Sequence, residues 1–252
     1  WDYKSRESLM RFARDVKMNH YIYASKTDPY HTSKWGELYP QSEIDQIQKL
    51  VKVGEETKCY YTWSVHISGF FTNLDTSNET AYNERYQKLL AKFRQLYDAG
   101  VRKFDILNDD FGQGTHEDVV NLLNKLTKEF IIPNNCKPIT YCMQGYNKAW
   151  SKEAELSALK KLDKSIILYW TGDDVNSPIT QETIDYVSEK TGHKQSDIYI
   201  SNGKFTEYIP HFTYHGFRYV RVICDAPVKP EDFTAVAHAG QFWARDKEEK
   251  NI

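Results

Sequence analysis

Helix-like and strand-like segments alternate along the chain, and this alternation constrains the fold more than any other feature of the sequence. In each helix-like segment apolar residues recur with helical periodicity, and a short apolar run typical of a buried strand follows it. In the first segment, for example, the pattern i, i+3, i+4, i+7 predicts one apolar face made of Leu9, Phe12, Ala13 and Val16. The predicted helices occupy approximately residues 9–16, 42–53, 82–96, 119–130, 156–162 and 180–192. The predicted strands occupy residues 20–24, 59–65, 103–107, 138–143, 165–170 and 197–201. Such a series is typical of an α/β protein built on a parallel sheet.

A (β/α)8 barrel of the TIM type explains this series best. With 252 residues and 40% hydrophobic composition, the chain can bury a full core. No proline-rich or serine-rich linker interrupts residues 1–196, so we expect them to form one barrel domain. Residues 197–252 form an atypical C-terminal segment, which we expect either to close the barrel or to belong to a β-structure of another kind.

The composition excludes several classes of partner and cofactor. The net charge of −2 comes from 35 acidic and 33 basic residues without a basic stripe, so we expect neither nucleic acid nor a membrane surface as a partner. No apolar run is long enough to span a membrane. The four cysteines lie far apart and none forms a C-x-x-C pair, so the pattern predicts buried free thiols and no zinc or redox site.

The stretch KFDILNDDFG, residues 103–112, carries the strongest chemical signal. Asp109 and Asp110 follow a predicted strand, and catalytic groups of such barrels lie at the carboxyl ends of strands. The two aspartates could simply cap a helix or populate a turn. Alternatively they could divide acid and base roles, because repulsion between neighbouring carboxylates favours the protonated form of one. A metal site that adds Asp105 is less favoured, because the spacing matches no EF-hand loop and no histidine lies nearby in the sequence.

Four ordered motifs together resemble the catalytic barrel of glycoside hydrolase family 84 over residues 1–192. These motifs are HYIYASKTDPYHTSKWGELYP at 20–40, KFDILNDDFG at 103–112, ITYCMQGYNKAW at 139–150 and ILYWTGDDV at 167–175. The family comprises β-N-acetylglucosaminidases, including O-GlcNAcases and bacterial enzymes often labelled hyaluronidases. The resemblance implies an N-acetylglucosamine-containing glycan or glycoprotein as the partner, no cofactor, and a bacterial extracellular or cell-surface location.

The resemblance also implies a mechanism. In this family the 2-acetamido oxygen of the substrate attacks the anomeric carbon and forms an oxazoline, so the enzyme supplies no covalent nucleophile and the configuration is retained. Asp109 is then expected to orient and polarise the acetamido group. Asp110 is expected to be the general acid and base.

Four more residues match positions that shape the sugar site in this family. Lys26 matches a lysine that binds a sugar hydroxyl, although lysines are more often solvated surface residues. Tyr146 matches a tyrosine that hydrogen-bonds the reacting acetamido region, and a half-buried structural aromatic is an equal alternative. Trp170 and Asp174 are expected to shape the mouth of the barrel, with a core position as the alternative for Trp170.

The chain departs from the family pattern in three places. The glycine-rich turn of the first strand is not found, so we expect a barrel that lacks its first strand. The clamp motif of the WWNYPVTD kind cannot be placed after Gly192, which predicts weak sugar binding. The segment PHFTYHGFRYV instead resembles a β-sandwich segment of bacterial α-L-rhamnosidases, without the catalytic carboxylates of that family. A non-catalytic N-acetylglucosamine-binding barrel is therefore the alternative function.

Overall fold

The structure is a computed structural model that describes residues 1–16, 18–109, 114–178 and 180–193. Five strands form one sheet in the sequential order β1-β2-β3-β4-β5, and every neighbouring pair is parallel. Their bounds are His20–Tyr23 for β1, Tyr60–His66 for β2, Phe104–Leu107 for β3, Thr140–Cys142 for β4 and Ile167–Leu168 for β5. The first five predicted strands are thus confirmed, and the sixth, at 197–201, lies outside the described residues.

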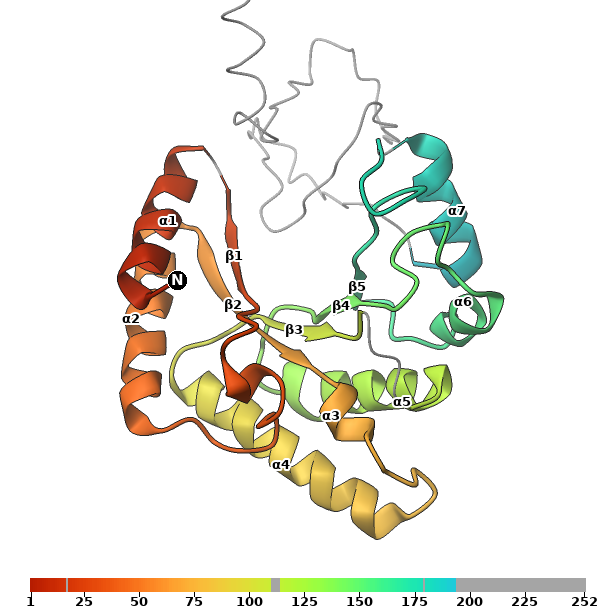
Figure 1. Ribbon diagram of the computed structural model, residues 1–252, viewed down its shortest axis with the longest axis horizontal. Coiled ribbons are helices and arrows are strands. Elements are labelled where there is room, and N and C mark those ends of the chain that lie inside the picture. Colours follow the sequence, from red (N-terminus) through yellow and green to blue (C-terminus); the bar gives the residue numbers. More distant parts are fainter. Residues whose placement is uncertain (17, 110–113, 179, 194–252) are drawn as a thin grey trace, which may run out of the picture.

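Helices connect the strands and lie along the outer side of the curved sheet (Figure 1). The helices are α1 Tyr3–Asp15, α2 Gln41–Thr57, α3 Ser68–Phe71, α4 Glu79–Asp98, α5 His116–Leu126, α6 Glu153–Leu159 and α7 Gln181–Thr191. A short helix η1 spans Pro29–His31, and η2, Thr127–Ile131, continues α5 as a turn of π-helix. The predicted parallel α/β class is confirmed by this arrangement.

Aromatic side chains fill the space between the sheet and its helices. The rings of Phe93 on α4 and Phe104 on β3 stack with centroids 4.6 Å apart, and Phe130 meets both edge-on at 5.6 and 5.8 Å. Trp63 on β2 meets Phe93 edge-on at 5.8 Å. All four are at most 1% exposed, so the aromatic residues of this region serve the core, where edge-to-face and stacked pairs are favourable.

The helix ends follow local capping chemistry. The predicted stop at Gly192 is confirmed, because Gly192 is the C-cap of α7 with a left-handed φ of 70°. Gly100 follows the C-cap of α4 at φ 98°. At the start of α5, Thr115 and Asp118 bond each other's backbone N–H in a capping box.

The buried face of α1 differs from the predicted one. Periodicity assigned Leu9, Phe12 and Ala13 to the core face, yet Phe12 is 42% exposed and the buried residues are Arg6, Met10 and Ala13. Arg6 takes this place because its guanidinium lies 4.8 Å from the centroid of the Tyr23 ring and donates to Tyr21 Oη at 3.1 Å. A cation over aromatic faces can substitute for an apolar residue there.

Two further expectations concern thiols and membranes. Cys59 is buried, whereas Cys136 and Cys142 are partly exposed, which corrects the prediction of buried thiols for these two; none of the three forms a disulfide with another described cysteine. Cys224 lies outside the described residues. In the part of the chain that the structure describes, no helix combines the length and apolar character needed to cross a membrane.

Candidate functional site

The carboxyl ends of the five parallel strands lie at one edge of the sheet, and the predicted site residues follow these ends. Lys26 comes after β1, Asp109 after β3, Tyr146 after β4 and Trp170 after β5. Loops at this edge carry the active sites of parallel α/β enzymes. The fold therefore brings the loops that bear these four residues to a common edge.

Asp109 is held at this edge by a histidine from the neighbouring strand. The Nε2 atom of His66, the last residue of β2, lies 2.8 Å from the backbone carbonyl oxygen of Asp109 and 3.9 Å from its Oδ1 atom. The Nδ1 atom of His66 accepts from the Ser68 backbone N–H at 3.3 Å, so the ring proton is on Nε2 and points to Asp109. The Asp109 side chain is 24% exposed.

The Oδ1 atom of Asp109 is buried and accepts no hydrogen bond from any described residue. A buried carboxylate oxygen without a donor is costly, and such atoms are typical of places where a ligand supplies the missing donor. This buried Oδ1 atom could therefore accept a hydrogen bond from an N–H or O–H group of a ligand. Asp110, the other candidate carboxylate, lies outside the described residues.

Two buried polar residues, Asn108 and Asp105, precede Asp109 along the chain. Asn108 is 2% exposed and donates from Nδ2 to Tyr141 Oη at 3.5 Å. Asp105 is fully buried and accepts from Tyr169 Oη at 2.9 Å. Burial raises the pKa of Asp105 to about 6, against the opposing effects of Lys103 and of its hydrogen bonds.

The loop that carries Tyr146 is built on a buried carboxylate. Glu155 on α6 is 2% exposed and accepts from the backbone N–H of Gln144 and of Gly145, both at 2.9 Å. The Tyr146 carbonyl accepts from the Thr171 backbone N–H at 2.9 Å, which links this loop to the one after β5. The Tyr146 ring is half-buried and meets the exposed Trp150 ring nearly edge-on at 5.3 Å.

Trp170 lies partly buried at the end of β5. Its ring stacks on the ring of Tyr186 from α7 with centroids 5.9 Å apart. Its Nε1 atom is buried and has no hydrogen-bond partner among the described residues. Trp170 is thus neither wholly core nor wholly exposed, and its indole N–H is an unused donor near the carboxyl edge.

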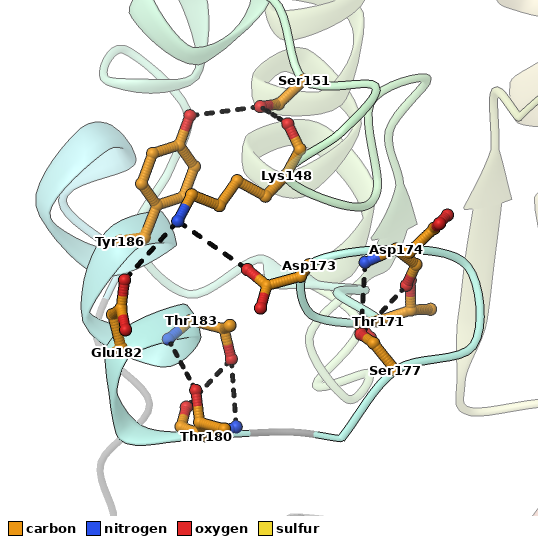
Figure 2. Close-up of polar contacts among 10 residues, drawn as sticks. All are labelled: Lys148, Ser151, Thr171, Asp173, Asp174, Ser177, Thr180, Glu182, Thr183 and Tyr186. Carbon is orange, nitrogen blue, oxygen red and sulfur yellow. Dashed lines mark hydrogen bonds and ion pairs between the residues drawn. The ribbon is translucent and has the colours of Figure 1, made fainter.

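The Asp174 side chain serves the loop that contains it. The side-chain Oδ1 atom of Asp174 accepts from the Val175 backbone N–H at 2.7 Å. The backbone carbonyl oxygen of Asp174 accepts from Thr171 Oγ1 at 2.9 Å. Figure 2 shows Ser177 bonded to the same Asp174 backbone. Asp174 is exposed, so the structure shows a loop-stabilising role for it.

A lysine joins the two loops after β4 and β5 to α7. The Nζ atom of Lys148 lies 3.8 Å from Asp173 Oδ1 and 3.6 Å from Glu182 Oε1, and 5.4 Å from the ring centroid of Tyr186 (Figure 2). Tyr186 Oη lies 3.2 Å from Ser151 Oγ. These exposed ion pairs contribute little to stability individually, but together they orient the loops around Trp170.

Lys26 is exposed at the start of the loop between β1 and α2. The organising residue of that loop is Asp28, which sequence reasoning did not single out. Its carboxylate accepts from Tyr23 Oη at 2.9 Å, from Tyr39 Oη at 2.7 Å and from the Tyr30 backbone N–H at 2.8 Å. Only Thr27 separates Lys26 from this fixed carboxylate, so the loop position of Lys26 is well defined.

His66 was also missed as a site residue, although one signal could have identified it. It is a titratable residue at the carboxyl end of β2, and Asp109 follows the carboxyl end of the neighbouring strand β3 by two residues. Among the described residues, no group of three or more His, Cys, Asp or Glu side chains could hold a metal ion.

Comparisons with known proteins agree with this geometry. The family model described as beta-N-acetylglucosaminidase matches residues 1–202. The chain therefore belongs to the β-N-acetylglucosaminidase family, glycoside hydrolase family 84. A bacterial alpha-L-rhamnosidase concanavalin-like domain matches residues 174–238, in keeping with the resemblance of the C-terminal segment.

Curated relatives and solved structures support the same assignment. Protein O-GlcNAcase of Rattus norvegicus and that of Mus musculus are each 26% identical over 206 residues, covering 75% of this chain and 22% of theirs. The structure of CpGH84D is 33% identical with a TM-score of 0.71, covering 77% of this chain and 33% of its own. The structure of CpGH84B is 30% identical with a TM-score of 0.70, covering 76% and 35%. The chain thus spans between 22% and 35% of the length of these relatives.

Proposed function

We propose that this protein is a retaining β-N-acetylglucosaminidase that releases terminal N-acetylglucosamine from glycans or glycoproteins. The observation that carries the proposal is the buried Oδ1 atom of Asp109, which accepts no hydrogen bond from the described residues at the carboxyl edge of the sheet. A 2-acetamido N–H group is a donor that fits this acceptor. The names of the curated relatives, Protein O-GlcNAcase, favour a sugar attached to protein as the substrate class.

Asp109 would act on the acetamido group as the glycosidic bond breaks. Its carboxylate accepts a hydrogen bond from the acetamido N–H, takes up that proton as the ring closes and returns it when the ring opens, which increases the electron density on the acetamido oxygen. That oxygen attacks the anomeric carbon and forms an oxazoline while the bond to the leaving group breaks. His66 would support this step as a positioning residue, because its Nε2–H fixes the backbone carbonyl of Asp109.

Asp110 would act as general acid and base. In the first step it donates its proton to the departing oxygen, and in the second it accepts a proton from the water that attacks the anomeric carbon and opens the oxazoline. Two inversions at the same carbon give net retention. No cofactor or metal takes part in this sequence.

The remaining site residues would hold the sugar. Lys26 would donate to a sugar hydroxyl, and Tyr146 would hydrogen-bond the acetamido region. Trp170 would form part of the wall of the sugar pocket, because its Nε1–H group has no acceptor among the described residues and could donate to the sugar. Asp174 would shape the mouth only through its loop, because its side chain binds the Val175 backbone.

The barrel architecture belongs to the same proposal. Sequential parallel strand order and helices on the outer side of a curved sheet support a (β/α)8 barrel of the TIM type (Figure 1). The division into a barrel over 1–196 and a separate segment over 197–252 stays a prediction, because the second part lies outside the described residues.

A non-catalytic N-acetylglucosamine-binding barrel is the second candidate, because the clamp motif of the family is not found after Gly192. Turnover of an aryl N-acetyl-β-glucosaminide separates the two. The proposed enzyme releases the phenol, and Asp110→Asn abolishes most of that release. Saturable binding of N-acetylglucosamine without phenol release would instead establish the binding protein.

A further inference from the structure

Lys92 is a buried lysine on α4 that no step of the proposed chemistry uses. Its side chain is fully buried, which is exceptional for a lysine unless its ammonium group has partners. The Nζ atom donates to the carbonyl oxygen of Tyr30 at 3.0 Å and to that of Lys34 at 2.9 Å. Both carbonyls belong to the loop between β1 and α2, which also carries Lys26.

Aromatic rings surround the same amine. Its Nζ atom lies 5.1 Å from the ring centroid of Tyr30, 4.9 Å from that of Tyr39 and 6.0 Å from that of Trp63. Aromatic faces attract a cation and exclude water from it. Two carbonyls and three rings together make a site that fits one lysine amino group, which can donate to both carbonyls whether it is charged or neutral, and the site fixes the chain segments that supply these partners.

A second residue of α4, one turn further on, binds the far end of the same loop. The Gln95 side-chain amide donates from Nε2 to the Tyr39 carbonyl at 2.8 Å and accepts the Tyr39 backbone N–H at Oε1 at 2.9 Å. Tyr39 in turn donates from Oη to Asp28 at 2.7 Å. Helix α4 therefore holds the loop in its middle and at its far end, and two of the residues it binds, Tyr30 and Tyr39, both donate to Asp28, two positions after Lys26.

We propose that Lys92 and Gln95 are positioning residues that fasten the β1–α2 loop to α4 and thereby hold Lys26 at the carboxyl edge of the sheet. The part that concerns Lys26 rests on the proposed function. The part that concerns the loop does not, because it can be measured without any substrate.

Hydrogen exchange of the loop amides tests the first part. Tyr30, His31 and Lys34 donate their backbone N–H groups to acceptors within the loop, to the Asp28 side chain, the Asp28 carbonyl and the Pro29 carbonyl respectively. In Lys92→Met, an apolar side chain of similar length, these amides should exchange roughly tenfold faster, while amides of β2 and β3 keep their protection. The control is Arg94→Met, at an exposed basic residue of the same helix, which should leave all of these rates unchanged.

Kinetics with an aryl N-acetyl-β-glucosaminide test the second part. Loss of correct Lys26 placement removes binding that is equal in the ground and transition states, so Lys92→Met should raise KM about tenfold with kcat nearly constant. In a Lys26→Met background the same substitution should raise KM no further, because the contact it positions is already absent. A merely structural role would give the same additional loss in both backgrounds.

Gln95→Leu provides an independent reading if Lys92→Met does not fold. It should accelerate exchange of the Tyr39 amide and of the same loop amides, without change in β2 or β3. The proposal would be overturned if the loop amides of the folded variants exchanged at unchanged rates. It would also be overturned if the exchange rates of the sheet amides rose as much as those of the loop amides. Absence of turnover in the unmodified protein would contradict the proposed function, while the exchange result would still decide the role of α4.

Discussion

The Nε2 atom of His66 donates to the backbone carbonyl of Asp109 across 2.8 Å, so the last residue of β2 fixes the end of β3. We predict that His66→Leu lowers kcat roughly tenfold to a hundredfold with little change in KM, because a small displacement of a catalytic group is costly in the transition state. Steady-state kinetics with an aryl N-acetyl-β-glucosaminide measure this effect.

His66→Gln is the matched control, because its amide nitrogen can still donate to the Asp109 carbonyl. It should retain most of the activity. A folded His66→Leu protein with unchanged kcat would contradict the positioning role of His66.

The two aspartates should respond differently to the leaving group. Asp110→Asn should reduce turnover most for substrates with poor leaving groups, because their departure depends on proton donation. Asp109→Asn should reduce turnover equally for good and poor leaving groups, because the acetamido nucleophile needs its assistance whichever phenol departs. A series of aryl N-acetyl-β-glucosaminides with graded phenol acidity measures both slopes, and equal slopes for the two variants would contradict the assigned roles.

Lys92 should make stability depend on pH in the alkaline range. Desolvation lowers the pKa of its amine from 10.5 to about 7, against the opposing charges of Asp28 and Glu37. Between these values the unfolded chain binds more protons than the folded one, so stability should rise with pH, by up to about 1.4 kcal/mol per pH unit.

Urea unfolding of the native protein and of Lys92→Met at pH 7, 8 and 9 isolates this effect. As pH rises, the free energy of unfolding of the native protein should increase relative to that of Lys92→Met. A difference that stays constant over this range would show that Lys92 keeps its charge in the folded state.

Asp105 should produce the opposite trend in the acidic range. Burial raises the pKa of this carboxyl from 3.8 to about 6, so between these values the folded protein binds more protons than the unfolded chain. Stability should therefore fall as pH rises from about 4 to 6, by roughly 3 kcal/mol in total. In Asp105→Asn this fall in stability should be absent, which urea unfolding at pH 4, 5 and 6 measures. If the variant loses stability over this range as the native protein does, Asp105 is not the cause.

The element order was predictable from the sequence because it depends on local signals. Apolar periodicity, the left-handed position of Gly192 and the apolar strand runs all act within a few residues. The α1 face was wrong because Arg6 owes its burial to Tyr21 and Tyr23, which belong to another element. Periodicity counts only apolar residues, so it cannot identify an arginine that packs on aromatic rings.

The site residues likewise fall into those that neighbouring residues in the sequence identify and those that depend on contacts between distant segments. The position of Asp109 at a strand end was predictable from neighbouring residues, and the family motifs singled out Lys26 and Tyr146. The contact of His66 with Asp109 joins residues 43 positions apart, and that of Lys92 with Tyr30 spans 62 positions. Such contacts depend on sheet register and helix packing, which no local pattern in one sequence specifies.

The central claim is that the substrate supplies the nucleophile and that Asp109 assists it. The most direct test compares kcat/KM for an aryl N-acetyl-β-glucosaminide with that for the aryl β-glucoside, which carries a hydroxyl in place of the 2-acetamido group. The account predicts that the glucoside is cleaved at least about a thousandfold more slowly, because the intramolecular nucleophile is lost. Comparable values for the two substrates would show that a protein carboxylate attacks instead, and would contradict the role of Asp109.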